Sequence, residues 1–263
     1  MAARKSRTAR PLIRNKLWIF DFDNTIARLE PEVDWAGGRR ELEPMLRELG
    51  VPEDLFENYP RGNLPLYDGM RTRLLELARE PQSGFTAARV RSILRRASQM
   101  IERYEMVGVD RAAPLEGAGD LLEQLRQRGA RLAIVTSNSS RVIRRWFSRH
   151  RRARLLDAII GRDSLLALKP SPEMILRALE RCEVPAGASA FVGDADSDYC
   201  AAAAAGLEFF GIAFSENLRD KLVAAGARGV FSSPAALGIH LGLIDAAEVA
   251  SRDDSETRAS HRT

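Results

Sequence analysis

The sequence predicts an α/β protein in which a doubly wound, mostly parallel sheet carries an all-helical insertion. Two observations predict the sheet. Short apolar runs rich in β-branched residues recur along the chain, and amphipathic segments of helical length separate most of them. A third observation predicts the insertion, because residues 28–114 show helical patterns only. The chain of 263 residues is long enough for one large core or for two unequal domains.

The first predicted strand is LWIFDF (17–22), and five further runs continue the pattern. They are RLAIVTS (131–137), DAIIG (157–161), SAFVGDA (189–195), FFGIAF (209–214) and GVFSS (229–233). Between them we expect helices in LEGAGDLLEQLRQRG (115–129), SSRVIRRWFSRH (139–150), SPEMILRALERC (171–182) and SDYCAAAAAGL (197–207). Strands that alternate with helices of this length favour a parallel sheet with helices on both faces, a Rossmann-like arrangement.

The insertion contains three long helical patterns and nothing that looks like a strand. These patterns are WAGGRRELEPMLRELG (35–50), GMRTRLLELARE (69–80) and TAARVRSILRRASQMIERYEM (86–106), the last with Thr86 as its expected N-cap. In open α/β folds, ligands bind beyond the carboxyl ends of the strands, so an insertion that leaves strand one there is placed to act as a lid. We therefore expect a core domain of residues 17–27 and 115–245, a helical cap domain of residues 28–114, and polar, disordered tails at 1–16 and 246–263.

The N-terminal sixteen residues carry six cations and no acid, and no apolar segment typical of a secretory signal follows them. A disordered tail is the simplest interpretation, and an organellar transit peptide is the alternative. These six cations exceed the net charge of +4, which leaves −2 for the rest of the chain and argues against a nucleic-acid surface. No apolar run approaches the roughly 20 residues that a membrane-spanning helix needs.

The cysteines and histidines do not form a metal-binding pattern. Cys182 and Cys200 lie far apart in the sequence, and the three histidines form no cluster. We expect both cysteines to be reduced, semi-buried thiols of an intracellular protein, and we therefore predict a cytoplasmic location.

Four groups of polar residues lie at or near the carboxyl ends of predicted strands. They are Asp21 and Asp23 in DFDNT, Thr136 with Ser137 and Asn138 after LAIV, Lys169 in LALKPSPEM, and Asp194 with Asp198 in GDADSD. Residues two apart point to the same side of an extended chain, so Asp21 and Asp23 both face the expected crevice while Phe22 faces the core. Each group alone is explained by a turn or a helix cap, but the four together are hard to explain that way.

Together these groups predict a site for phosphoryl transfer. Several carboxylates placed close together need a cation, and hard oxygen ligands select Mg²⁺, which often takes a substrate phosphate oxygen as a further ligand. Thr136 and Lys169 supply the donors and positive charge that a transferring phosphoryl group needs. Lys169 is one of only four lysines among the 40 basic residues, which adds weight to its position.

These segments resemble the motifs of the haloacid dehalogenase superfamily of Mg²⁺-dependent phosphohydrolases. DFDNT (21–25) is similar to its first motif, IVTSN (134–138) to the second, LKPSPEMI (168–175) to the third and FVGDADSDYCAAAAAG (191–206) to the fourth. The helical insertion stands where that family has a C1-type cap. PLEGAGDLLEQLRQRG (114–129) is similar to the helix before the second motif in the phosphoglycolate-phosphatase-like branch.

The resemblance implies a role for each matched residue. Asp21 would be the nucleophile that forms an aspartyl-phosphate, and Asp23 would protonate the leaving alkoxide and then activate water. Mg²⁺ would be held by Asp21, the backbone carbonyl of Asp23 and Asp194, with Asp198 in or near its coordination shell. Thr136, with Ser137 and Asn138 beside it, would bind the phosphoryl group, and Lys169 would neutralise negative charge on the nucleophile and the intermediate.

Residue identity narrows the activity within the superfamily. Asp23 argues against dehalogenases, which have no leaving alkoxide to protonate. The lack of any lysine between Lys16 and Lys169 argues against phosphonate-cleaving members, which use a cap lysine. We therefore expect hydrolysis of a small, soluble phosphate monoester. The alternatives are a phosphosugar mutase of the same superfamily and a non-catalytic protein that binds a phosphorylated ligand.

The substrate cannot be named from this sequence, and no feature indicates an oligomeric state. The cap has one loop with the glycine and proline content of a lid turn, YPRGNLPLYDG (59–69), in which Arg61 is a candidate for binding a substrate anion. A solvated loop arginine is the alternative interpretation of Arg61.

Overall fold

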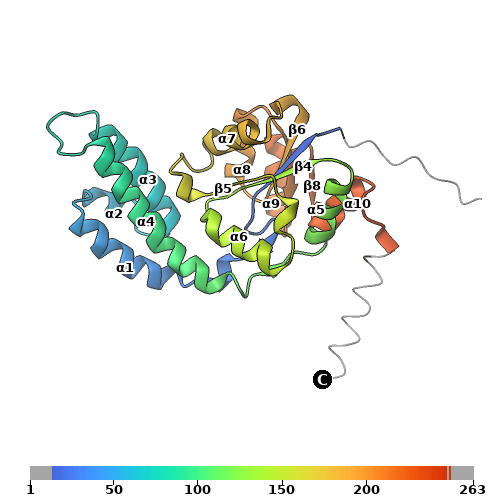
Figure 1. Cartoon of the computed structure of the whole chain (residues 1–263), viewed down its shortest axis with the longest axis horizontal. Helices are drawn as coiled ribbons and strands as arrows, with labels where there is room; N and C mark the ends of the chain where they lie inside the picture. Colours follow the sequence, from blue (N-terminus) through green and yellow to red (C-terminus); the bar gives the residue numbers. More distant parts are fainter. Residues whose placement is uncertain (1–13, 248, 250–263) are drawn as a thin grey trace, which may run out of the picture.

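The computed structural model describes residues 14–247 and 249, and a parallel sheet of six strands lies at its centre (Figure 1). The strands are β1 (Leu17–Phe20), β4 (Arg131–Val135), β5 (Ala158–Ile160), β6 (Ser189–Gly193), β7 (Glu208–Ile212) and β8 (Gly229–Phe231), in the spatial order β5-β4-β1-β6-β7-β8. All neighbouring pairs are parallel, so the predicted α/β fold is confirmed.

Helices cover both faces of the sheet, as expected for a doubly wound fold. Leu17 and Ile19 of β1 pack on one face, where the covering helices are α7 (Glu173–Cys182), α8 (Asp196–Ala204) and α9 (Glu216–Ala225). Trp18 and Phe20 pack on the opposite face, where the covering helices are α5 (Ala118–Gln127), α6 (Ser140–Arg149) and α10 (Pro234–His240). Burial on both faces explains why the strands are almost continuously apolar in sequence.

The connections between strands change direction at β1, which is the topological switch point of the sheet. The chain passes from β1 to β4 and β5 on one side, and then returns to β6, β7 and β8 on the other. The carboxyl ends of β4, β1 and β6 therefore border the crevice in which open α/β sheets bind their ligands. The loops after these three strands carry most of the polar residues that the sequence singles out.

The insertion is a group of helices beside the sheet, at the left of Figure 1. Its helices are α1 (Trp35–Glu48), α2 (Asp54–Asn58), α3 (Asn63–Leu77) and α4 (Ala87–Gly108), and α4 packs against both α1 and α3. Thr86 caps α4 as predicted, because its hydroxyl oxygen accepts a hydrogen bond of 3.2 Å from Arg89 N. Short 3₁₀ turns occur at Glu30–Glu32, Ala153–Leu155, Arg162–Ser164 and Ala186–Ala188.

The expectation that residues 28–114 contain no strand was wrong at both ends. Strands β2 (Ala27–Arg28) and β3 (Ala113–Pro114) pair in an antiparallel manner where the chain enters and leaves the insertion. A two-residue strand is too short to show alternating hydrophobicity, so no sequence pattern could reveal it. The pairing holds the two connections side by side.

The predicted lid loop at residues 59–69 is shorter than expected, because α3 begins at Asn63. Proline is tolerated in the first turn of a helix, so Pro65 does not delay the start of α3. Gly69 lies inside the helix, where a Cβ atom would come within 2.2 Å of the Tyr59 ring. The glycine there permits close packing and does not mark a turn. Helix α2 was also missed, because it is only five residues long.

The terminal segments and the cysteines differ in part from expectation. Most of the predicted tails, residues 1–16 and 246–263, lies outside the described residues, but Asn15 and Lys16 bind the core through Glu208 Oε2 at 3.2 Å and Ala188 O at 2.8 Å. Cys182 is buried and Cys200 is exposed, so neither is semi-buried.

In the part of the chain that the structure describes, every helix is too short or too polar to cross a membrane.

A buried ion pair joins the insertion to the sheet. Glu105 of α4 and Arg162, which follows β5, are both fully buried, and two parallel hydrogen bonds of 2.7 and 2.9 Å connect them. Glu105 also accepts hydrogen bonds from Asn138 Nδ2 at 3.1 Å and from Ser139 N at 3.2 Å. One carboxylate thus connects a helix of the insertion to two loops at the carboxyl edge of the sheet.

We predict that Glu105→Ala destabilises the protein strongly, because it leaves the Arg162 guanidinium buried without a counter-charge. Removing one partner of such a pair costs about 3–5 kcal/mol. The free energy of unfolding in urea measures the loss. A matched control is Glu180→Ala, which removes one partner of the exposed pair with Arg177 and should cost less than about 1 kcal/mol.

The double variant Glu105→Leu with Arg162→Met separates the buried charge from the lost contacts. It should be more stable than Glu105→Ala, because no buried charge is left unpaired. It should remain less stable than the wild type, because Asn138 Nδ2, Ser139 N and Ser137 O lose hydrogen-bond partners. Equal losses for Glu105→Ala and Glu180→Ala would contradict the account.

Candidate active site

Asp21 lies immediately beyond the carboxyl end of β1, and its backbone is fixed to the neighbouring strand. Asp21 N donates a hydrogen bond of 2.9 Å to Val192 O of β6. Phe22 turns the other way into the core and meets the Trp146 ring edge-on, with ring centroids 5.3 Å apart. The spacing of the motif therefore sends the Asp21 side chain to the crevice and the Phe22 side chain to the core.

Asp23 is held by the loop that follows. Its Oδ1 accepts hydrogen bonds from Leu29 N at 2.8 Å and from Glu30 N at 3.1 Å. Asn24 has φ of 53°, which bends the chain back so that Asn24 N donates to Ala27 O. Burial raises the pKa of Asp23 above its usual value, although these backbone donors oppose the shift. A carboxyl group held through one oxygen can exchange a proton through the other.

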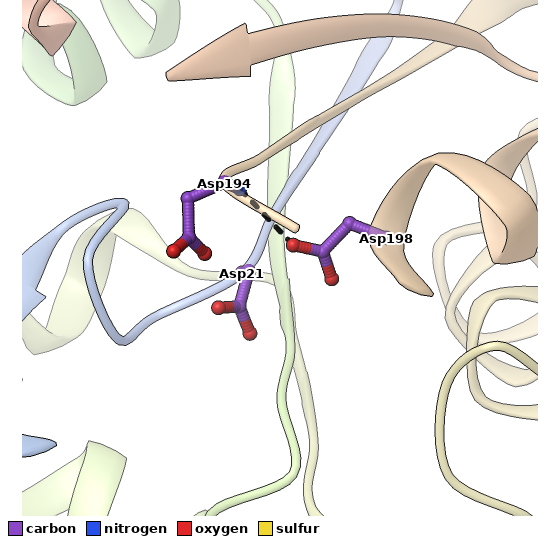
Figure 2. Close-up of side chains that lie close together, drawn as sticks. All are labelled: Asp21, Asp194 and Asp198. Atoms are coloured by element: carbon purple, nitrogen blue, oxygen red, sulfur yellow. Dashed lines mark hydrogen bonds between the residues drawn. The ribbon is translucent and has the colours of Figure 1, made fainter. Parts of the chain in front are cut away.

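Three aspartates converge at the ends of β1 and β6. Carboxylate oxygens of Asp21, Asp194 and Asp198 all lie within 4.8 Å of one another (Figure 2). Figure 2 shows Asp194 at the end of its strand and Asp198 pointing from the first turn of α8 toward the other two. Asp198 Oδ2 accepts hydrogen bonds from Asp194 N and Ala195 N, both at 3.1 Å, and so fixes the turn that positions Asp194.

Lys169 supplies one positive charge to this cluster. Its Nζ lies 2.6 Å from Asp21 Oδ1 and 2.5 Å from Asp198 Oδ1, and its side chain is only 5% exposed. Burial alone would lower the pKa of Lys169, but Asp198 and Asp21 raise it above its usual value, so the side chain stays charged. One ammonium faces three carboxylates, and this leaves the cluster short of positive charge.

The pKa values of two of these acids are raised. Burial is the largest cause, and it raises the pKa of Asp21 to about 7 against the opposing effect of Lys169. Burial, with the negative charges of Asp21 and Asp198, raises the pKa of Asp194 to about 8. A cation bound between these carboxylates would remove the cost of ionising them.

Hydrogen bonds within the loop after β4, and from this loop to Glu105 and Arg162, hold its residues 136–138 in place. Thr136 Oγ1 donates to Asn138 Oδ1 at 3.0 Å and accepts from Asn138 N at 3.2 Å. The Asn138 amide also donates to Glu105, and Arg162 Nη1 donates to Ser137 O at 2.7 Å. These contacts fix the peptide units around Ser137, so the buried ion pair between the insertion and the sheet also orients this loop.

A cavity of about 450 Å³ joins these groups. Eight of the nine residues that the sequence analysis singled out line it: Asp21, Asp23, Thr136, Ser137, Asn138, Lys169, Asp194 and Asp198. The ninth, Arg61, is exposed and is not among the lining residues. The reason is local, because α3 starts two residues later and presents Asn63, Leu64 and Pro65 to the cavity instead.

Several residues at the site were not identified from the sequence. Glu30, Trp35, Asn63, Leu64 and Pro65 line the cavity from the insertion side, and Glu105 with Arg162 supports the loop after β4. For these residues the sequence offered one signal: Asn63 lies at a predicted turn, and asparagine favours turns and helix starts. Glu105 and Arg162 are two among 36 acidic and 40 basic residues, and nothing in their local sequence distinguishes them.

Comparisons with known proteins identify a family and related sequences. The family model described as haloacid dehalogenase-like hydrolase matches residues 66–212. A Pseudomonas syringae pv. tomato protein named phosphoglycolate phosphatase is 28% identical over 204 residues, which cover 77% of this chain and 71% of that protein. A Pseudomonas fluorescens protein of the same name is 33% identical over 101 residues, which cover 38% of this chain and only 37% of that protein's length.

Solved structures share the fold at low sequence identity. A haloacid dehalogenase-like hydrolase from Bacteroides fragilis superposes with a TM-score of 0.58 at 20% identity, covering 83% of this chain and 97% of its own. CbbY from Rhodobacter sphaeroides, solved in complex with phosphate, has a TM-score of 0.53 at 21% identity, covering 85% of this chain and 96% of its own. The family model spans more than half of the chain, and the chain therefore belongs to the haloacid dehalogenase-like hydrolase family.

Proposed function

We propose that this protein hydrolyses a small phosphate monoester, with Mg²⁺ as its cofactor and with an aspartyl-phosphate on Asp21 as the intermediate. The observation that carries the proposal is the buried cluster in which Asp21 lies close to Asp194 and Asp198 and contacts Lys169 at 2.6 Å. The names of the curated relatives support the same reaction class. Each residue role below is part of this proposal.

The donor set fits a divalent, oxygen-binding cation. Three carboxylates and one ammonium leave an excess of negative charge. Burial, together with the neighbouring aspartates, raises the pKa of both Asp21 and Asp194. Asp21, Asp194 and the backbone carbonyl of Asp23 would hold Mg²⁺, with Asp198 supporting the same shell. When bound, Mg²⁺ supplies positive charge that offsets the charge on the phosphoryl oxygens and helps to orient them.

In this proposal Asp21 is the nucleophile and Asp23 is the general acid and base. The Asp21 carboxylate attacks phosphorus, a bond forms between its oxygen and phosphorus, and the bond from phosphorus to the ester oxygen breaks. Asp23 donates its proton to the leaving oxygen. It afterwards accepts a proton from the water that attacks phosphorus, and the bond between phosphorus and Asp21 breaks, which frees inorganic phosphate and the Asp21 carboxylate. The raised pKa of Asp23 favours the protonated form that the first step needs.

The remaining residues position the phosphoryl group. Lys169 neutralises charge that develops around Asp21, which it contacts at 2.6 Å. The fixed loop of Thr136, Ser137 and Asn138 also lines the cavity and would bind the phosphoryl oxygens. We propose that residues 28–114 form a cap domain, because several of its residues line the cavity beside these groups. Such a domain would reduce the access of water to the reaction.

We predict that Asp21→Asn removes activity while the fold is retained, because an amide is a poor nucleophile. Release of inorganic phosphate from 4-nitrophenyl phosphate with Mg²⁺ should fall by at least about a thousandfold in kcat. Asp196→Asn is the matched control, since Asp196 is an exposed aspartate at the start of α8 that does not line the cavity. Comparable activity of Asp21→Asn and the parent would rule out Asp21 as the nucleophile.

We also predict that Mg²⁺ stabilises the protein more at pH 8 than at pH 6. The folded state holds protons on Asp21 and Asp194 up to about pH 7 and 8, so the metal-free protein loses stability as the pH rises past the ordinary carboxyl pKa. Mg²⁺ binds the ionised forms and therefore competes with protons at pH 6. Saturating Mg²⁺ at pH 8 should raise Tm by about 5 °C or more.

Thermal unfolding of the wild type and of Asp194→Asn, each with and without Mg²⁺, measures this effect. The shift should be lost in the variant because one ligand is removed. An equal shift in both proteins, or a larger shift at pH 6, would contradict the assignment of the metal site.

A further inference from the structure

Lys169 lies in an irregular segment, residues 165–172, which we call the lysine segment. The segment runs from the 3₁₀ turn Arg162–Ser164 to the start of α7. The Lys169 ammonium contacts Asp21 Oδ1 at 2.6 Å and Asp198 Oδ1 at 2.5 Å. Because a lysine stem is flexible, the place of its ammonium depends on where the backbone is held. The contacts that hold the lysine segment therefore bear on the site.

Helix α3 of the insertion holds the lysine segment at two points. Asp68 Oδ1 accepts a hydrogen bond of 3.3 Å from the backbone N–H of Leu168, the residue immediately before Lys169. Arg71 Nε donates a hydrogen bond of 3.1 Å to Leu165 O. Asp68 and Arg71 are three residues apart on α3, so they lie on the same side of the helix. That side of α3 faces the lysine segment.

Arg71 also reaches the far end of the lysine segment. Its Nη2 lies 3.2 Å from Oε2 of Glu173, the first residue of α7. The same Glu173 oxygen accepts a hydrogen bond of 2.9 Å from Ala167 N. The Arg71 side chain is only 15% exposed, so solvent screens these contacts little. One guanidinium thus connects α3 to both ends of the segment.

Helix α4 holds the opposite side of the site in a similar way. Glu105 of α4 accepts hydrogen bonds from Asn138 Nδ2 and Ser139 N in the loop after β4. Two helices of the insertion therefore bind the two segments that carry Lys169 and Thr136. These contacts join the insertion to the core, and they also fix the backbone from which both side chains extend.

We propose that Asp68 and Arg71 are positioning residues for Lys169, because they hold the lysine segment so that its ammonium stays against Asp21. The inference rests on the proposed function, in which Lys169 neutralises charge that develops around Asp21. An ammonium displaced by about 1 Å stabilises the transition state less, while most contacts of the bound substrate remain. The loss should therefore fall on kcat and not on KM.

Two variants of Asp68 compare loss with rescue, in the full chain with Mg²⁺ and 4-nitrophenyl phosphate. Asp68→Ala removes the acceptor for Leu168 N, so kcat should fall by at least about tenfold while KM changes by less than about threefold. Asp68→Asn keeps a side-chain oxygen that can accept this bond, so it should keep at least about a third of the wild-type kcat. Equal losses in the two variants, or a loss mainly in KM, would overturn the proposal.

Arg71→Ala has a matched control on the same helix. Arg73 pairs with Glu76 of α3 at 3.5 Å, and its side chain is 42% exposed. We expect kcat to fall by at least about tenfold in Arg71→Ala and to stay within about twofold of the wild type in Arg73→Ala. Each variant is measured well below its own Tm, so that unfolding does not imitate a loss of kcat. Similar kcat values for Arg71→Ala and Arg73→Ala would contradict the proposal.

Amide hydrogen exchange tests the same contact without activity. In Asp68→Ala the Leu168 amide should exchange at least about tenfold faster than in the wild type, while the amides of β1 and β4 stay protected. Unchanged exchange at Leu168 would mean that Asp68 does not hold the segment. Faster exchange in the strands as well would mean that the whole protein is destabilised, and either result overturns the proposal.

The wild-type protein separates failure of this inference from failure of the proposed function. If it releases no phosphate from 4-nitrophenyl phosphate or from other monoesters with Mg²⁺, the proposed function is wrong, and this inference is wrong with it. If the wild type is active but Asp68→Ala and Arg71→Ala keep kcat within about twofold, only the inference about Asp68 and Arg71 fails.

Discussion

The site depends on the burial of three carboxylates beside a single lysine at the switch point of a parallel sheet. Asp21, Asp194 and Asp198 come from two strand ends and one helix start, and Lys169 touches two of them. Such a cluster is unfavourable in isolation, as the raised pKa values of Asp21 and Asp194 show. The fold tolerates it because backbone donors and Lys169 hold the acids in place, and because a cation can complete the charge balance.

The insertion adds two separate connections to this centre. One is structural: Glu105 of α4 binds Arg162 and two groups of the loop after β4, so the helical part and the loop are held as one unit. The other is at the cavity, which the starts of α1 and α3 help to line. In our proposal the core provides the reaction, and the insertion acts as a cap beside it.

The sequence predicted the sheet and the site better than it predicted the insertion. Strands such as Leu17–Phe20 are buried on both faces and are followed by polar residues. An apolar run that ends in polar residues therefore predicted both the strand and the end of it that borders the crevice. Eight of nine candidate residues line one cavity for the same reason. Their catalytic roles remain predictions.

The misses have physical causes. The pairing of Ala27–Arg28 with Ala113–Pro114 joins segments far apart in sequence and leaves no local pattern. The start of α3 at Asn63 was hidden by Gly62, Pro65 and Gly69, residues that usually mark a turn. The Glu105–Arg162 pair exists only because tertiary packing buries two residues 57 positions apart, and no local signal announces such a contact.

The most direct test of the central claim is to locate the phosphoryl group during turnover. In Asp23→Asn with 4-nitrophenyl phosphate and Mg²⁺, the good leaving group needs little protonation, whereas hydrolysis of the intermediate loses its base. Acid quenching followed by peptide mass spectrometry should then find the phosphoryl group on Asp21. Release of 4-nitrophenol with Asp21 unmodified, or with the phosphoryl group on another residue, would contradict the account.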